Sequence, residues 1–198
     1  MYMNPLSRVK TPKYEDQRVG VFVDVQNLYY SAYNIYHARV NFGAILDAVA
    51  YKRKVVRAIA YVIRADQPEE QNFFDALNKQ GYEVRQKPLQ TFIGGAKKGD
   101  WDVGMTLDII SLVQKLDTIV LVSGDGDFDD VLQYIKANGA RAEVVAFGKS
   151  TASRIKEMAD DFVDLDAEYK KYTLPMPKKN GGHANKDKED RNVKIYTP

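Results

Sequence analysis

The sequence predicts an α/β protein in three layers, with a parallel sheet between two layers of helices. Apolar segments rich in β-branched residues alternate along the chain with segments of helical periodicity. The chain has 198 residues, of which 44% are hydrophobic and 28% charged, the balance of one globular domain with tails. Strands that alternate with helices form βαβ units with right-handed crossovers, and these build a parallel sheet.

Five strands are expected, and their character predicts their order. Val19–Val23 and Thr118–Val122 are continuously apolar, so they should lie at the centre of the sheet. Tyr82–Lys87 alternates charged with other residues, which is typical of an edge strand. Numbered along the chain, these strands fit the order 3-2-1-4-5, which changes direction between strands 1 and 4. The expected strands are Val19–Val23, Val55–Ile63, Tyr82–Lys87, Thr118–Val122 and Arg141–Phe147, and Phe162–Leu165 could add a short sixth.

The helices are predicted from apolar periodicity and from residues that favour helix ends. Asn41 suits the N-cap of one helix, and Pro68 suits the first position of another, which stops at Gly81. The segment Asp102–Lys115 is apolar nearly all round, so we expect it to be well buried. Further helices are expected over Leu28–Tyr36, Asp127–Asn138 and Thr151–Ala159.

Charge and composition divide the chain into three parts. Residues 18–170 carry the strand and helix pattern, whereas residues 1–17 are expected to be a flexible segment. Beyond them, 171–198 are rich in Lys, Asn, Gly and Pro without periodicity, so we expect a basic, disordered tail. Residues 100–130 have a net charge of −7 and residues 37–64 one of +5, which suggests a cation site beside an anion-binding surface.

Composition excludes several classes of protein. The sequence contains no Cys and only two His, His37 and His183, so thiolate chemistry, Cys-based metal sites and His-rich metal sites are excluded. No apolar run approaches the ~20 residues that span a bilayer, and the N-terminus lacks the apolar core of a signal peptide. We therefore expect a cytoplasmic protein without a membrane association.

Acidic residues follow the two central strands at their carboxyl ends. Asp24 ends the first strand, and Asp125 and Asp127 follow the fourth in the sequence Ser123–Phe128. Asp102 opens the helix that leads into the fourth strand. Ligands bind where the strand order reverses, and clustered carboxylates repel one another without a cation. An all-oxygen ligand set favours Mg²⁺ or Mn²⁺.

Other motifs fit these residues less well. Ser123–Phe128 is not a dinucleotide fingerprint, because Asp occupies the phosphate-facing turn. It is not an EF-hand loop, since Asp130 and Lys136 stand where Gly and Glu are required. The sequence at 148–151 imitates the end of a P-loop, but Glu143 stands where the first Gly belongs. A tight turn with acids at a helix N-terminus is the simpler structural alternative.

Three segments together resemble the NYN domain, more narrowly its bacterial LabA-like branch within the PIN-like nuclease superfamily. They are VGVFVDVQNLYYSA, KKGDWDVGMTLDI and VLVSGDGDFDDVLQYIKANGARAEVVAFG, which fall in residues 19–166 in this order. The resemblance implies a metal-dependent ribonuclease on a parallel sheet. It implies functional roles for Asp24, Asn27, Lys98, Asp102, Asp108, Ser123, Asp125 and Asp127.

The second and third motifs depart from the family pattern. The family reads KGxD, whereas residues 98–102 are one residue longer, so either Asp100 or Asp102 can be the ligand. Asp129 and Asp130 follow Phe128 where the family has apolar or neutral residues, which leaves the ligand set there open. Asp108 lies about 240° around the helix from Asp102, so we expect it to support the site or to anchor a neighbouring backbone group.

The expected chemistry is hydrolysis of a phosphodiester by one or two Mg²⁺ ions. We expect Asp24 and Asp125 to be the principal ligands, with Asp102 and Asp127 completing the site or orienting bound waters. Asn27 could donate to a phosphate oxygen, and Lys98 could reach the scissile phosphate.

RNA would need a basic path and aromatic surfaces. Trp101, between two acids, is the best candidate for stacking a base. Tyr29, Tyr30, Tyr33 and Tyr36 surround a helix that begins beside the acidic residues, so one face of it could also stack bases. The basic candidates are Arg39, Lys52, Arg53, Lys54, Arg57 and the C-terminal tail.

Two functions from different classes remain open. The first is an endoribonuclease that prefers single-stranded RNA, and the second is a non-catalytic RNA- or protein-binding module on the same fold. A metal-dependent phosphatase is disfavoured, because such enzymes carry a second Asp where this chain has Gln26. A homodimer is possible for either function.

Overall fold

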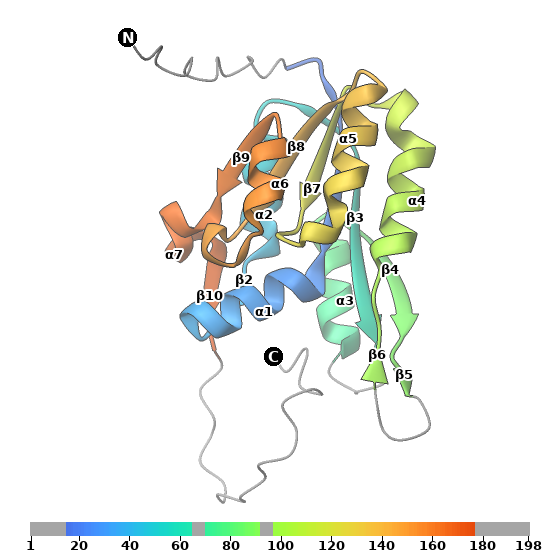
Figure 1. The fold of residues 1–198 in the computed structure, drawn as a ribbon. Helices are drawn as coiled ribbons and strands as arrows, with labels where there is room; N and C mark the ends of the chain where they lie inside the picture. Colours follow the sequence, from blue (N-terminus) through green and yellow to red (C-terminus); the bar gives the residue numbers. More distant parts are fainter. Residues whose placement is uncertain (1–14, 65–69, 92–96, 177–198) are drawn as a thin grey trace, which may run out of the picture.

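A computed structural model describes residues 15–64, 70–91 and 97–176, and its centre is a parallel sheet (Figure 1). The strand order is β4-β3-β1-β7-β8-β9. The five predicted strands lie in the predicted order, and a sixth strand extends the sheet beyond them. The strands are β1 Arg18–Asp24, β3 Lys54–Arg64, β4 Glu83–Pro88, β7 Thr118–Val122, β8 Arg141–Ala146 and β9 Asp161–Asp164.

Helices cover both faces of the sheet. One core contains α1 Val25–Tyr36, α2 Phe42–Ala50, α3 Glu70–Lys79 and α7 Tyr169–Tyr172. The other contains α4 Asp102–Leu112, α5 Asp129–Ala137 and α6 Ser153–Met158. None of these helices, in the part of the chain that the structure describes, is long and apolar enough to cross a membrane.

The central strand β1 shows how the sequence divides between the two cores. Val21 and Val23 face the core of α1, α2 and α3, whereas Phe22 faces the core of α4, α5 and α6. All three are fully buried. Gly20 lies where a Cβ atom would come within 2.5 Å of the Leu116 Cδ1 atom, so a larger residue would require Leu116 to shift. This two-sided burial explains the continuous apolar run.

Several short elements were not predicted. β2 Ala38–Val40 pairs with β10 Thr173–Pro175, and β5 Gln90–Thr91 pairs with β6 Lys97–Lys98, both antiparallel. Residues 171–176, which we expected to be disordered, therefore complete α7 and form β10. The expectations for residues 1–14 and 177–198 lie outside the described residues. Short 3₁₀ turns are η1 Val113–Lys115, η2 Gly126–Phe128, η3 Gly148–Ser150 and η4 Leu165–Glu168.

The prediction that α4 is well buried is wrong. Met105 and Ile109 enter the core, but Val103, Leu107 and Ile110 are 68%, 60% and 38% exposed. α4 lies in an outer layer of the molecule and contacts the sheet with one face only (Figure 1). Apolar composition alone therefore does not distinguish this helix from an enclosed one.

The basic residues between 52 and 57 do not lie near the acidic residues at the carboxyl ends of the strands, contrary to the prediction of a shared RNA path. Lys54 begins β3, so this segment lies at the amino edge of the sheet, opposite the carboxyl ends. Arg53 is buried and its guanidinium donates to both carboxylate oxygens of Glu143, at 3.1 Å each. Arg57 pairs with Glu83, and Lys52 lies 3.7 Å from the carboxylate of Glu15. Arg53 thus stabilises the fold and is not available to RNA.

Candidate active site at the carboxyl edge

A pocket of about 210 Å³ lies at the carboxyl ends of β1 and β3. Its walls come from the start of α1, the end of β3, the residues that lead into α4 and the turn after β7. Four carboxylates from three separate segments line it. The lining residues are Asp24, Gln26, Asn27, Tyr30, Tyr61, Ile63, Asp100, Trp101, Asp102 and Asp125.

Asp24 ends β1 and caps α1. Its Oδ1 atom accepts the backbone N–H of Asn27 at 3.0 Å, and its Oδ2 atom accepts the hydroxyl of Ser123 at 3.3 Å. Burial, together with the negative charges of Asp102 and Asp125, raises the pKa of Asp24 to about 6, although these two hydrogen bonds act to lower it. A nearby cation would stabilise the ionised form of a carboxylate held in this way.

The turn after β7 is tied to the start of α1. The Asn27 Oδ1 atom accepts the backbone N–H of Gly124 at 3.0 Å, and the Ser123 hydroxyl accepts the backbone N–H of Asp125 at 3.2 Å. A Cβ atom on Gly124 would lie 2.8 Å from the Thr151 Oγ1 atom, so only glycine fits there. Ser123 and Asn27 therefore fix the relative position of Asp24 and Asp125.

Asp100 and Asp102 both line the pocket, because Trp101 between them turns onto β3. The Trp101 indole N–H donates to the Val62 carbonyl oxygen at 2.8 Å. Its ring centroid lies 5.2 Å from that of Tyr61, and the Lys87 Nζ atom lies 5.0 Å from it. Residues 98–102 are one residue longer than the family pattern, and the packing of Trp101 on β3 accommodates this extra residue. Trp101 forms part of the pocket wall, and its role in stacking a base stays a prediction.

Tyr61 is a pocket residue that the sequence analysis missed. It lies on β3 directly beside Asp24 of β1, and its hydroxyl donates to Asp108 at 2.8 Å. Burial and the Asp108 carboxylate raise the pKa of Tyr61, so its hydroxyl stays protonated. Asp108, which also lies 3.5 Å from Arg85, therefore anchors a side chain of the pocket and does not line it. The strand order could have revealed Tyr61, because β3 neighbours β1.

The structure does not bring the other predicted acids into this pocket. η2 buries Phe128 and leaves Asp127 exposed, with its backbone N–H donating to Asp125 at 3.1 Å. Asp129 pairs with Arg154 at 2.7 Å. Asp127 is therefore corrected from a direct ligand to a residue outside the pocket lining. Lys98 lies in β6, two residues before Asp100.

Comparison with known proteins decides the family. The model of the NYN domain matches residues 18–166. This chain belongs to the NYN domain family. The cyanobacterial "Low amplitude and bright protein LabA" of Synechococcus elongatus is 26% identical over 164 residues, which cover 77% of this chain and 86% of that protein. A crystal structure of a protein of unknown function from Vibrio parahaemolyticus is 32% identical, with a TM-score of 0.75, and the match covers 83% of this chain and 100% of that one.

These similarities place the chain among PIN-like, RNase-type domains. NYN domains are generally nucleases and typically use divalent metals. Within residues 15–64, 70–91 and 97–176, no three acidic or His side chains converge on one metal position. The donor chemistry of this NYN domain nevertheless suits Mg²⁺, which often binds through one or two carboxylates, waters and substrate phosphates.

Proposed function

We propose that this NYN domain hydrolyses phosphodiester bonds in single-stranded RNA with the help of Mg²⁺ or Mn²⁺. The observation that carries the proposal is the placement of Asp24, Asp100, Asp102 and Asp125 around one pocket. Asp24 is the most telling of them, because its burial beside two like charges costs free energy that a bound cation would offset.

The residues of the pocket can be given separate roles. Asp24 and Asp125 would hold the cation, with Asp100 or Asp102 as a further oxygen donor. The cation, when bound, supplies an activated water and stabilises negative charge at the phosphate. The amide NH₂ of Asn27 would orient a phosphate oxygen, because its carbonyl oxygen is already engaged by Gly124.

A single strand is the favoured substrate because the pocket is small. Its volume is about 210 Å³, and it is walled by the rings of Tyr30, Tyr61 and Trp101. A flexible strand can bend a phosphate into such a pocket, whereas a stiff duplex presents its phosphates on a broad convex surface. The backbone of Lys98 lies two residues before Asp100, so this Lys remains a proposed phosphate contact.

A second candidate is a non-catalytic RNA-binding module on the same fold. It is favoured by the absence, among the described residues, of three acidic side chains that converge on one metal position. The two candidates differ in one respect only: the module binds RNA without metal-dependent turnover.

The decisive experiment compares wild type, Asp125→Asn and Asp127→Asn with end-labelled single-stranded RNA in Mn²⁺, in Mg²⁺ and in EDTA. The proposed enzyme cleaves in either metal, loses cleavage with Asp125→Asn and keeps it with Asp127→Asn, which is exposed and outside the pocket. A generic phosphatase substrate in parallel tests for phosphomonoester hydrolysis. Binding without cleavage by wild type would favour the module, and equal cleavage by all three proteins would indicate a contaminant.

A further inference from the structure

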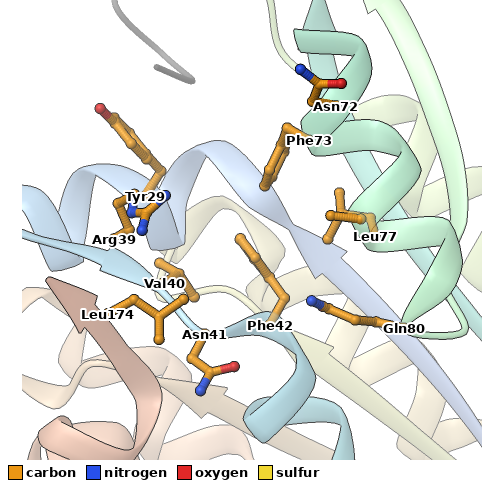
Figure 2. A pocket seen from close by; sticks show the side chains of 11 residues that line it. Tyr29, Arg39, Val40, Asn41, Phe42, Asn72, Phe73, Leu77, Gln80 and Leu174 are labelled. Carbon is orange, nitrogen blue, oxygen red and sulfur yellow. The ribbon is translucent and has the colours of Figure 1, made fainter. Parts of the chain in front are cut away.

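A second pocket, of about 220 Å³, lies on the face of the sheet that α1, α2 and α3 cover (Figure 2). It is bounded by α1, β2, the start of α2, α3 and β10. Its volume is below the roughly 300–1,000 Å³ of pockets for drug-sized ligands, which suits one planar ring system. The described lining contains no carboxylate, in contrast to the acidic pocket.

The lining combines aromatic rings with amide groups. Figure 2 shows Tyr29 on one side of the pocket and the rings of Phe73 and Phe42, 5.9 Å apart, on the other. Asn41, Asn72 and Gln80 bring side-chain amides to the same pocket. Aromatic faces stack unpaired bases, and amides bond to base edges. This is the chemistry by which proteins hold a single nucleobase.

A guanidinium group, that of Arg39, completes the lining of the pocket. Arg39 lines it, and its Nε–H donates to the carbonyl oxygen of Pro175 at 3.3 Å, which fixes the guanidinium beside β10. Arg39 is the one predicted RNA-binding Arg that lies next to this pocket rather than at the amino edge of the sheet. A guanidinium at this place can pair with the phosphate of a bound nucleotide.

Consecutive residues of α1 line the two pockets. Tyr30 lines the acidic pocket and Tyr29 lines the second one, and their ring centroids lie 5.7 Å apart on α1. One strand that crosses α1 at these two residues would reach both pockets.

We propose that the second pocket binds an unpaired nucleobase of the RNA strand whose scissile phosphate lies in the acidic pocket. This inference rests on the proposed function, because it assigns the base that accompanies the reacting phosphate. Tyr29 and Phe73 stack the base, Asn72 and Gln80 contact its edge, and Arg39 holds the adjoining phosphate.

The first test measures the affinity of the full chain for a fluorescent single-stranded RNA in EDTA. Tyr29→Ala should weaken binding by roughly five- to a hundredfold, the range for loss of one stacked base, whereas Tyr29→Phe should bind as wild type does. Gln80→Ala, an exposed position, gives a smaller loss without risk to folding. Tyr134→Ala is the matched control, because Tyr134 is exposed on α5 at the other face of the sheet.

The second test locates the base. RNAs that carry one 5-iodouridine are irradiated on the full chain in EDTA, and the crosslinked peptide is identified by mass spectrometry. A crosslink to Tyr29 or Phe73 is expected. Crosslinks elsewhere only, or unchanged affinity of both Tyr29→Ala and Gln80→Ala, would overturn the inference.

Neither test needs metal or hydrolysis, so the two proposals can fail separately. Metal-dependent cleavage with no role for Tyr29 refutes the base pocket alone. A crosslink at Tyr29 without any metal-dependent cleavage refutes the nuclease and leaves the pocket as a binding site.

Discussion

At the scale of single residues, Asp24 serves both folding and the proposed chemistry. Its carboxylate caps α1 through the Asn27 N–H, and it also lines the acidic pocket. These two roles oppose each other in free energy, since the cap stabilises the helix while burial near Asp102 and Asp125 penalises the charge.

We predict that Asp24→Asn stabilises the metal-free protein at pH 8. The folded-state pKa of about 6 lies above the ordinary value of 3.8, so ionisation costs the native state up to about 3 kcal/mol above pH 6. Asn removes this cost and still caps the helix. The cost disappears as the pH falls from 6 towards 4, where Asp24 is protonated. Urea unfolding of wild type and Asp24→Asn in EDTA at pH 8 and pH 4.5 measures this difference in stability. If the variant is more stable by the same amount at both pH values, the raised pKa of Asp24 is contradicted.

We predict that Asp125 and Asp127 differ in metal binding although they are two residues apart. Asp125 lines the pocket and Asp127 points to solvent. Asp125→Asn should weaken Mn²⁺ binding by roughly tenfold or more, and Asp127→Asn should leave it unchanged. Isothermal calorimetry on both variants checks this, and equal affinities would show that the pocket is not the metal site.

The sequence predicted Asp24, Asp102 and Asp125 because each adjoins an element whose direction can be inferred. It misplaced Asp127 because a 3₁₀ turn, which periodicity does not reveal, aims that side chain outward. The sequence could not decide between Asp100 and Asp102 for a similar reason. Only the packing of Trp101 on Val62 shows that both of these acids face the pocket.

At the scale of elements, a buried ion network joins the start of β3 to β8. Arg53 and Arg141 both donate to the Oε1 atom of Glu143, at 3.1 and 2.9 Å, and Arg53 also donates to the Val49 carbonyl oxygen. The side chains of Arg53 and Glu143 are 2% and 1% exposed. Such a pair connects the turn before β3 to β8, and each buried charge depends on the other for compensation.

We predict that Glu143→Gln lowers the free energy of unfolding by about 3–5 kcal/mol, because it leaves a buried guanidinium uncompensated. The double variant Arg53→Met with Glu143→Leu should lose less than this single change, since the most deeply buried pair is removed together and the remaining Arg141 still lies 3.8 Å from the carboxylate of Asp161. Lys52→Met, at the exposed Lys52–Glu15 pair, is the control and should cost at most about 1 kcal/mol. Urea denaturation compares the four proteins. If Glu143→Gln lowers the free energy of unfolding only slightly, the buried Arg53 guanidinium does not depend on the Glu143 charge.

Composition could not separate Arg53 from Lys52 and Lys54, because all three look alike in a basic run. Only the folded turn between α2 and β3 brings Arg53 inward, where it donates to the Val49 carbonyl oxygen and to Glu143. The exposed face of α4 escaped prediction likewise, since one apolar helix can lie in the middle of a protein or in its outer layer.

At the scale of the whole molecule, the order of the strands in the parallel sheet was predictable. Two strands, β1 and β7, are apolar on both faces, and β4 alternates charged with other residues. The short antiparallel pairs β2–β10 and β5–β6 were not, because strands of two or three residues carry too little pattern. β10 matters most among them, since it brings Leu174 to the second pocket.

We predict that deletion of residues 177–198 weakens RNA binding without loss of chemistry. This segment carries six Lys and Arg residues and three acidic ones. Its removal should flatten the dependence of affinity on salt by about 0.7 per lost phosphate contact, because fewer counterions are released. Cleavage at saturating RNA should be unchanged. Binding titrations from low to high salt on both proteins provide the measurement, and a cleavage defect at saturation would assign the tail a catalytic role.

The direction of the strands also has a practical consequence for mounting the protein on a surface. β1 begins at Arg18 on the amino edge, whereas β10 ends at Pro175 beside the pocket that contains Leu174. An anchor attached ahead of β1 would leave both pockets facing the solution, and an anchor attached behind β10 would press them towards the support. For immobilised single-molecule recordings with fluorescent RNA, the tether therefore belongs ahead of β1.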